Sequence, residues 1–118
     1  MELKFRAWDE AKQEFIYSDQ IAGGMWRYFK TLEDRGIRHF ESEQYIGAED
    51  KNNKAVYRGD LLKDVNKFAG VIHEVYFNER SLSYRLRVNG EMQFDKTRFI
   101  DFVRFMEIVG NIHENKEI

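Results

Sequence analysis

Residues 82–90 read Leu-Ser-Tyr-Arg-Leu-Arg-Val-Asn-Gly, and this stretch decides the fold. Apolar or aromatic side chains at positions 82, 84, 86 and 88 alternate with polar side chains at 83, 85 and 87. This is the period of a strand with one buried face. Asn89-Gly90 is the strongest short signal for a two-residue hairpin turn. The chain is therefore expected to turn here and to return as a second strand over 91–94.

The flanking sequence adds further short strands. Residues 3–8 alternate apolar and basic side chains, and residues 15–17 return after a polar turn, so the chain is expected to open with a hairpin. Asn52-Asn53 predicts a tight turn within 45–57, because asparagine tolerates positive φ. Strands are also predicted at 61–65, 68–77 and 107–112. This succession predicts a mainly all-β fold, an N-terminal β-hairpin followed by a small SH3-like barrel.

Two segments are ambiguous. Apolar side chains at 25, 26, 29 and 32 fit one face of a helix, and Gly36 is a good terminator, so the spacing predicts a short helix around 25–35. A strand at 25–29 is the competing interpretation, because Trp, Tyr and Phe favour sheets. Apolar side chains at 99, 102, 103 and 106 predict a second short helix around 96–104, with Asp95 as its N-cap.

Length and composition bound the class of protein. A chain of 118 residues fits one domain, 1–118. It has no cysteine, which excludes disulfides and thiolate metal sites and fits a reducing compartment. No segment has the apolar length of a membrane span or of a signal peptide, so the expected location is the cytoplasm of the cell, with no membrane partner.

Four ordered blocks of sequence resemble a known family. They are Lys-Phe-Arg-Ala-Trp-Asp at 4–9, Gln-Tyr-Ile-Gly at 44–47 with Asp-Lys-Asn-Asn-Lys at 50–54, Tyr-Arg-Gly-Asp at 57–60, and Glu-Ile-Val-Gly-Asn-Ile-His-Glu-Asn at 107–115. Together they closely resemble the YopX family of small phage and prophage proteins. The blocks occur in the family's order and span nearly the whole chain. Asn53 stands where the family usually has Gly, His113 where Tyr is common, and Lys116 where Pro is common.

The resemblance implies a single YopX-like domain with an all-β fold. Its N-terminal subregion is expected over 1–55 and its barrel-like core over 56–114. The matched positions also make sense as structural residues, because glycines beside strands allow bends and carboxylates beside turns accept backbone N–H groups. The residues assigned this structural role are Trp8, Gly47, Gly59, Asp60, Gly110 and Asn111. The resemblance implies no particular activity.

No catalytic or metal-binding pattern is visible. His39, His73 and His113 are the only histidines, and none is paired at metal-ligand spacing. The adjacent acidic pairs at 33–34 and 49–50 are far more often solvated than functional. No serine lies in a nucleophile elbow, and no glycine-rich phosphate loop is present. We therefore expect no enzyme activity, no metal and no cofactor.

Two kinds of binding remain. Arg85 and Arg87, with Arg98 and Arg104, are candidates for a basic face that binds nucleic acid, as small barrels can do. The alternative is a solvated strand face with cross-strand partners such as Glu91. The 18 aromatic residues favour instead a protein-interaction module, because some must reach the surface. Its partner is expected to be a second copy of the chain or a host or phage protein. Residues 1–50 carry a net charge of −4, which disfavours a polyanion.

Overall fold

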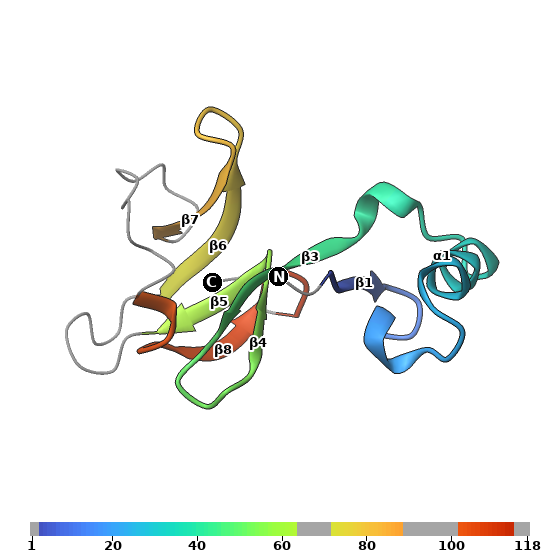
Figure 1. Cartoon of the computed structure of the whole chain (residues 1–118), viewed down its shortest axis with the longest axis horizontal. Helices are drawn as coiled ribbons and strands as arrows, with labels where there is room; N and C mark the ends of the chain where they lie inside the picture. The colour runs from blue at the N-terminus through green and yellow to red at the C-terminus, as the bar shows by residue number, and fades with distance from the viewer. Residues whose placement is uncertain (1–2, 64–71, 89–101, 115–118) are drawn as a thin grey trace. The chain divides into compact units, whose positions relative to one another are not determined.

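The computed structural model describes residues 3–63, 72–88 and 102–114. The chain divides into two compact units, Met1–Tyr45 and Ile46–Ile118, called here the N-terminal and C-terminal units. Strands dominate the described residues as a whole, and the one regular α-helix among them lies in the N-terminal unit (Figure 1). The predicted mainly all-β fold is thus confirmed. The expected subregion boundary after residue 55 differs from this division, and the assignment of one domain to 1–118 stays a prediction.

The N-terminal unit is built on the predicted hairpin. Strands β1 (Phe5–Asp9) and β2 (Glu14–Tyr17) pair antiparallel, and β1 also pairs with the start of β3 (Glu43–Glu49). The 3₁₀ turns η1 (Ser18–Gln20) and η2 (His39–Glu41) lie in the connections. Alternation along β1 puts Ala7 on one face and Trp8 on the other, as expected for a strand.

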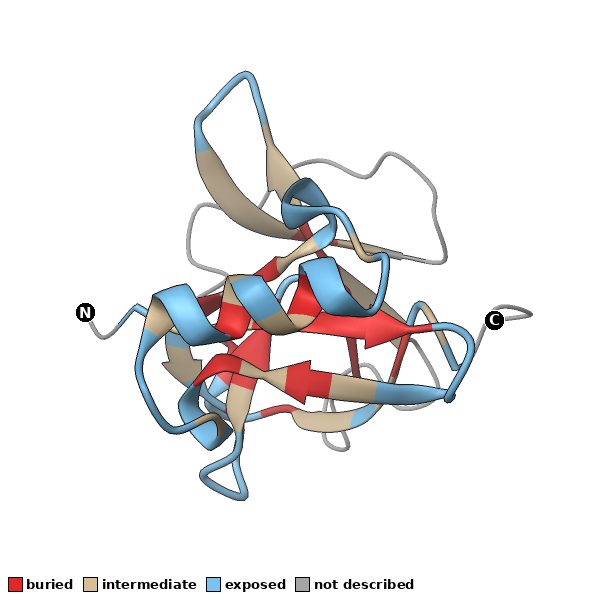
Figure 2. Ribbon diagram, turned by 90° about the vertical axis from the view of Figure 1, so that its right-hand side faces the viewer, coloured by how far each residue is buried: buried red, intermediate tan, exposed pale blue. Residues whose placement is uncertain are grey.

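Helix α1 (Met25–Asp34) confirms the helix predicted around 25–35. Its buried residues Tyr28 and Leu32 join Ala7 and Ile16 in the core of this unit. Figure 2 shows the opposite face of the helix exposed. The helix ends at Gly36, whose φ of 74° allows Ile37 N–H to reach back to the Leu32 carbonyl at 2.8 Å. This left-handed stop is the one that the sequence predicted.

The C-terminal unit contains a curled antiparallel sheet beside a hairpin. The hairpin consists of the end of β3 and β4 (Ala55–Tyr57). The sheet has the strand order β7-β6-β5-β8, formed by β5 (Asp60–Lys63), β6 (Ile72–Asn78), β7 (Ser83–Val88) and β8 (Glu107–Asn111). Side chains from the hairpin, the sheet and the segment before β8 form one core: Ile46, Val56, Leu62, Val75, Leu86, Val103 and Met106. These strands curl around one core as a half-barrel, in agreement with the predicted barrel-like core. Closure into an SH3-like barrel stays a prediction.

Turn chemistry explains the sharpest bends of this unit. Gly59, between β4 and β5, has a φ of 92°. Its N–H donates to the Val75 carbonyl and its own carbonyl accepts from Ile112 N–H, both at 2.9 Å. The buried Asp60 carboxylate accepts the Tyr57 N–H at 2.8 Å. The expected roles of Gly59 and Asp60 follow from this geometry.

Replacing Gly59 by Val is expected to lower the free energy of unfolding by more than about 1 kcal/mol, because a β-branched residue disfavours positive φ. Gly59 also bonds through both backbone groups, so the turn has little freedom to relax. The measurement is the urea midpoint of the two proteins. An unchanged midpoint would show that the turn can adopt another conformation.

The strand predicted at residues 82–88 is present as β7, but it begins one residue later than predicted. Leu82 lies in the turn before β7, with a φ of 53° and 76% of its surface exposed. The Asn78 side-chain oxygen accepts the Arg80 and Ser81 N–H groups and lengthens this turn, which delays the strand. The Asn89-Gly90 turn and the strand at 91–94 lie outside the described residues. Of the helix around 96–104, only Phe102 and Val103 are described as helical.

Candidate functional site

The two arginines on β7 have ordinary polar contacts, Arg87 across to β6 and Arg85 within its own strand. Arg87 lies opposite Glu74 of β6, and its guanidinium is 3.0 Å from the Glu74 carboxylate and 4.7 Å from the centre of the Tyr76 ring. Arg85 Nε donates to Ser83 Oγ at 2.9 Å. Glu74 is therefore the cross-strand partner of Arg87. Glu91, the cross-strand partner predicted from the sequence, lies outside the described residues. The positive charge of Arg87 is largely neutralised.

Of the other two arginines of the expected basic face, Arg98 lies outside the described residues. Arg104 is exposed just before β8, and β7 and β8 are opposite edges of the sheet order. Among the described residues, the structure thus brings together Arg85 and Arg87 only.

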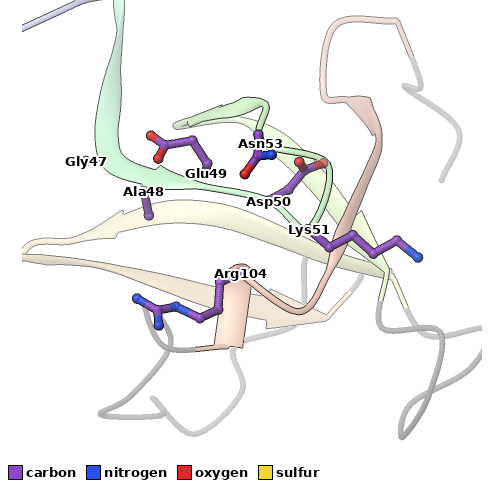
Figure 3. Close-up of a pocket in the computed structure, with 7 residues that line it drawn as sticks. All are labelled: Gly47, Ala48, Glu49, Asp50, Lys51, Asn53 and Arg104. Atoms are coloured by element: carbon purple, nitrogen blue, oxygen red, sulfur yellow. The ribbon is translucent and has the colours of Figure 1, made fainter.

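A shallow cavity of about 340 Å³ lies at the turn between β3 and β4. Its lining consists of Gly47, Ala48, Glu49, Asp50, Lys51, Asn53 and Arg104. Figure 3 shows the side chains of Lys51 and Arg104 pointing away from one another. The Asp50 carboxylate is already used by backbone N–H groups of Asn52, Lys54 and Ile108, at 2.8, 3.0 and 3.0 Å. These side chains therefore do not converge on a ligand.

Three of the residues that were expected to have structural roles lie at a bend, a bulge and a turn. Gly47 has a φ of 88°, directly after the point where β3 passes from one unit to the other. Gly110 lies opposite Leu61 at a β-bulge that leaves Val109 as the extra residue. The Asn111 side chain accepts the His113 and Glu114 N–H groups at 3.0 and 2.9 Å and caps the turn after β8.

Trp8 is buried, but it does not belong to the core beneath α1. Its ring packs edge-on against Phe15, with centroids 5.0 Å apart, and its Nε1 donates to Glu10 at 2.7 Å. It therefore anchors the sheet face opposite to Ala7.

The titratable groups give no metal centre among the described residues. No cluster of three or more histidine or acidic side chains could hold an ion there. His39 contacts Glu33 at 3.3 Å, whereas His73 lies on β6 and His113 follows β8. No helix in the described ranges is long and apolar enough to cross a membrane.

Asp9 is held in its charged form by Arg35. The guanidinium donates to the Asp9 carboxylate at 3.0 Å and lowers the pKa of Asp9 from its ordinary value of 3.8; the Lys12 N–H adds a smaller effect, and burial opposes both. A lowered native pKa means that this stabilisation is present above pH 3.8 and lost as the pH falls through the native pKa.

Replacing Arg35 by Met is therefore expected to lower the unfolding temperature most above pH 3.8, with the difference from the original protein shrinking below it. Thermal unfolding between neutral pH and the lowest pH at which the protein folds measures this. A matched variant, Lys12→Met, removes a charge from an exposed residue of the β1–β2 turn. Its unfolding temperature should differ from that of the original protein by the same amount at every pH. A difference that is constant with pH would show that Arg35 acts only by packing.

A strip of rings, exposed at its two ends and half-buried at Phe29 between them, lies on the N-terminal unit. Trp26 and Phe40 are 64% and 77% exposed. Trp26 neighbours Phe29 one turn along α1, the Phe29 ring is 4.7 Å from that of His39, and Phe40 follows His39. We call these four residues the aromatic strip. Two arginines accompany it, Arg27 4.7 Å from the Trp26 ring centre and Arg38 5.7 Å from that of Phe40.

The sequence predicted that some aromatics reach the surface, but it did not identify them. Trp26 was assigned to the apolar face of the helix, and the structure corrects this: the buried positions are Tyr28 and Leu32, and position 26 points outward. A helical wheel centred on those two positions is the signal that could have found it. Phe102 and Phe105 are also exposed, directly after residues outside the described ranges.

Known proteins match the chain in two ways. The family model described as "YopX protein" matches residues 4–118. The crystal structure of protein EF1440 from Enterococcus faecalis has a similar fold, with a TM-score of 0.56 and 19% identity, covering 99% of this chain and 97% of that one. No curated protein matches. Because the family model spans nearly the whole sequence, the chain belongs to the YopX family.

Proposed function

We propose that this chain is a non-enzymatic accessory protein of phage or prophage type that acts by binding protein, through the aromatic strip. The observation that carries the proposal is the exposure of Trp26 and Phe40, each with an arginine nearby. Large aromatics and arginine are the side chains enriched at protein interfaces and at their energetic centres. Burying one such ring on a partner contributes about 1.5–3 kcal/mol.

We also propose that the protein acts in the cytoplasm of the host cell and has no catalytic activity. A chain without cysteine suits the reducing cytoplasm of the host cell. In the cavity beside Asp50 the one buried carboxylate accepts three backbone N–H groups, which favours a structural role over acid–base chemistry. We propose no cofactor.

Photo-crosslinking in the producing cells tests this function. A benzoylphenylalanine residue replaces Trp26, and in a matched control it replaces Leu82, which lies on the C-terminal unit and is more exposed than Trp26. We expect protein adducts from position 26 and few or none from position 82. Equal labelling at both positions, or none at 26, would overturn the proposal.

Nucleic acid is expected not to bind through β7, because Glu74 neutralises Arg87. A gel shift with short duplex and single-stranded probes at two salt concentrations measures this. We expect no salt-sensitive binding near physiological ionic strength, and no change in the variant Arg85→Ser/Arg87→Ser. If both arginines contacted phosphate, affinity would fall with salt at a slope near −0.9 per contact, and the variant would lose about two units of slope. That result would restore the nucleic-acid alternative.

A further inference from the structure

We infer that the aromatic strip binds a second copy of this chain, with the two α1 helices antiparallel about a two-fold axis. This inference rests on the proposed function and names its partner. Three features of the N-terminal unit support it: the charge pattern along α1, the position of the two exposed rings, and the length of the helix.

The charges on α1 run against the helix's own dipole. Its exposed face carries Arg27 in the first turn, Lys30 near the middle, and Glu33 and Asp34 in the last turn. The first turn has no acidic residue, the last turn has no basic one, and Gly24 supplies no side-chain cap. Each unfavourable charge costs the isolated helix a few tenths of a kcal/mol.

The same pattern is self-complementary. When two such helices lie antiparallel, Arg27 of each copy faces Glu33 in the last turn of the other. The two-fold axis repeats this contact, so the interface contains it twice, as expected when both copies use the same surface. Lys30 falls near the axis, where two positive charges approach, but each is already paired with Asp34 of its own helix at 3.2 Å. An arrangement that is unfavourable in one helix thus becomes favourable between two.

The rings follow the same symmetry. Trp26 lies at the beginning of α1, whereas Phe40 lies beside its end, because the neighbouring His39 contacts Glu33. An antiparallel pair therefore brings each Trp26 to the Phe40 of the other copy. Eight residues separate Trp26 from Asp34, a span of about 12 Å, so both ring contacts and both charge contacts fit along a helix of this length.

The surface is small, which sets the strength expected. One helix of 10 residues and one short turn present less than the about 800 Å² per partner that a standard interface buries. We therefore expect a reversible dimer with a dissociation constant in the micromolar range.

Sedimentation equilibrium on the full chain, from low to several hundred micromolar, tests the inference. We expect a monomer–dimer equilibrium that Trp26→Ser and Arg27→Glu each weaken by about tenfold, or about 1.4 kcal/mol. Arg27→Glu places an acidic residue in the first turn, where the helix dipole favours it, so a loss of dimer would not reflect a loss of folding. The matched control Lys12→Glu makes the same kind of charge reversal at an exposed residue outside the strip and should leave the dimer intact.

A second reversal in the same chain provides the decisive test. Arg27→Glu/Glu33→Arg restores opposite charges across both copies at once, and it should recover the dimer to within a few-fold of the original. A chain that stays monomeric throughout, or a dimer indifferent to these changes, would overturn the inference. If the chain is monomeric while position 26 crosslinks to a different protein, only the second copy as partner is wrong. If it is monomeric and position 26 captures nothing, the proposed function falls too.

Discussion

Replacing Glu43 by Gln is expected to lower the free energy of unfolding by about 3–5 kcal/mol, which is a large part of the stability of a small protein. Glu43 Oε1 accepts from Arg6 Nε at 2.8 Å, and the two side chains are only 9% and 4% exposed. The amide of Gln carries no charge, so the variant removes the buried carboxylate that Arg6 Nε donates to and weakens the neutralisation of a buried guanidinium. Taking a lone charge out of water costs far more than losing a surface pair.

Urea unfolding measures this loss, and a second variant separates pairing from packing. In Arg6→Met/Glu43→Gln the buried guanidinium is gone as well, so much of the stability should return. The surface pair Lys30–Asp34 gives the matched control: at a protein concentration low enough to keep the chain monomeric, Asp34→Asn also turns a carboxylate into an amide, at an exposed site, and should cost no more than about 1 kcal/mol. Similar losses at Glu43 and Asp34 would mean that water reaches the Arg6 guanidinium.

Local signals in the sequence were reliable in this chain. Gly36, the Asn52-Asn53 turn and the Gly59-Asp60 turn each lie within a few residues of the groups that they bond, so the pattern itself specifies the structure. The alternating stretch that predicted a strand is β7. It begins one residue later than predicted because Asn78, five residues before Ser83, accepts two N–H groups of the preceding turn.

Contacts between distant residues were not predictable. Glu43 lies 37 residues from Arg6, and nothing in either segment indicates the other. The pairing of Arg87 with Glu74 needs the register of two strands, which a single sequence does not supply. The prediction that Trp26 lies on the buried face of α1 is wrong because a shift of one residue along a helix turns a side chain by about 100°. The aromatic strip therefore emerges only when the buried face of α1 is known.

Asp50 is the second residue whose replacement should have a large effect, and it lies within one of the blocks that define the family. Its carboxylate is 3% exposed and accepts three backbone N–H groups. Two belong to the turn between β3 and β4, and the third, from Ile108, belongs to the edge strand β8, 58 residues away. One side chain thus shapes a turn and joins the hairpin to the sheet of the C-terminal unit. It also occupies an edge N–H that would otherwise be open to another strand.

The variant Asp50→Asn is expected to lower the free energy of unfolding by about 2–4 kcal/mol, because an amide offers one acceptor oxygen and turns its NH₂ toward a backbone donor. Urea unfolding gives the size of the loss, and hydrogen exchange should place it at Ile108 and along β8. Asp34→Asn again serves as the exposed control. The same variant distinguishes a structural from a functional role for the block at 50–54. A structural carboxylate predicts lost stability, with dimer formation through Trp26 retained wherever the variant is folded. A variant as stable as the original would instead mean that the Asp50 carboxylate is available to a ligand in the neighbouring cavity.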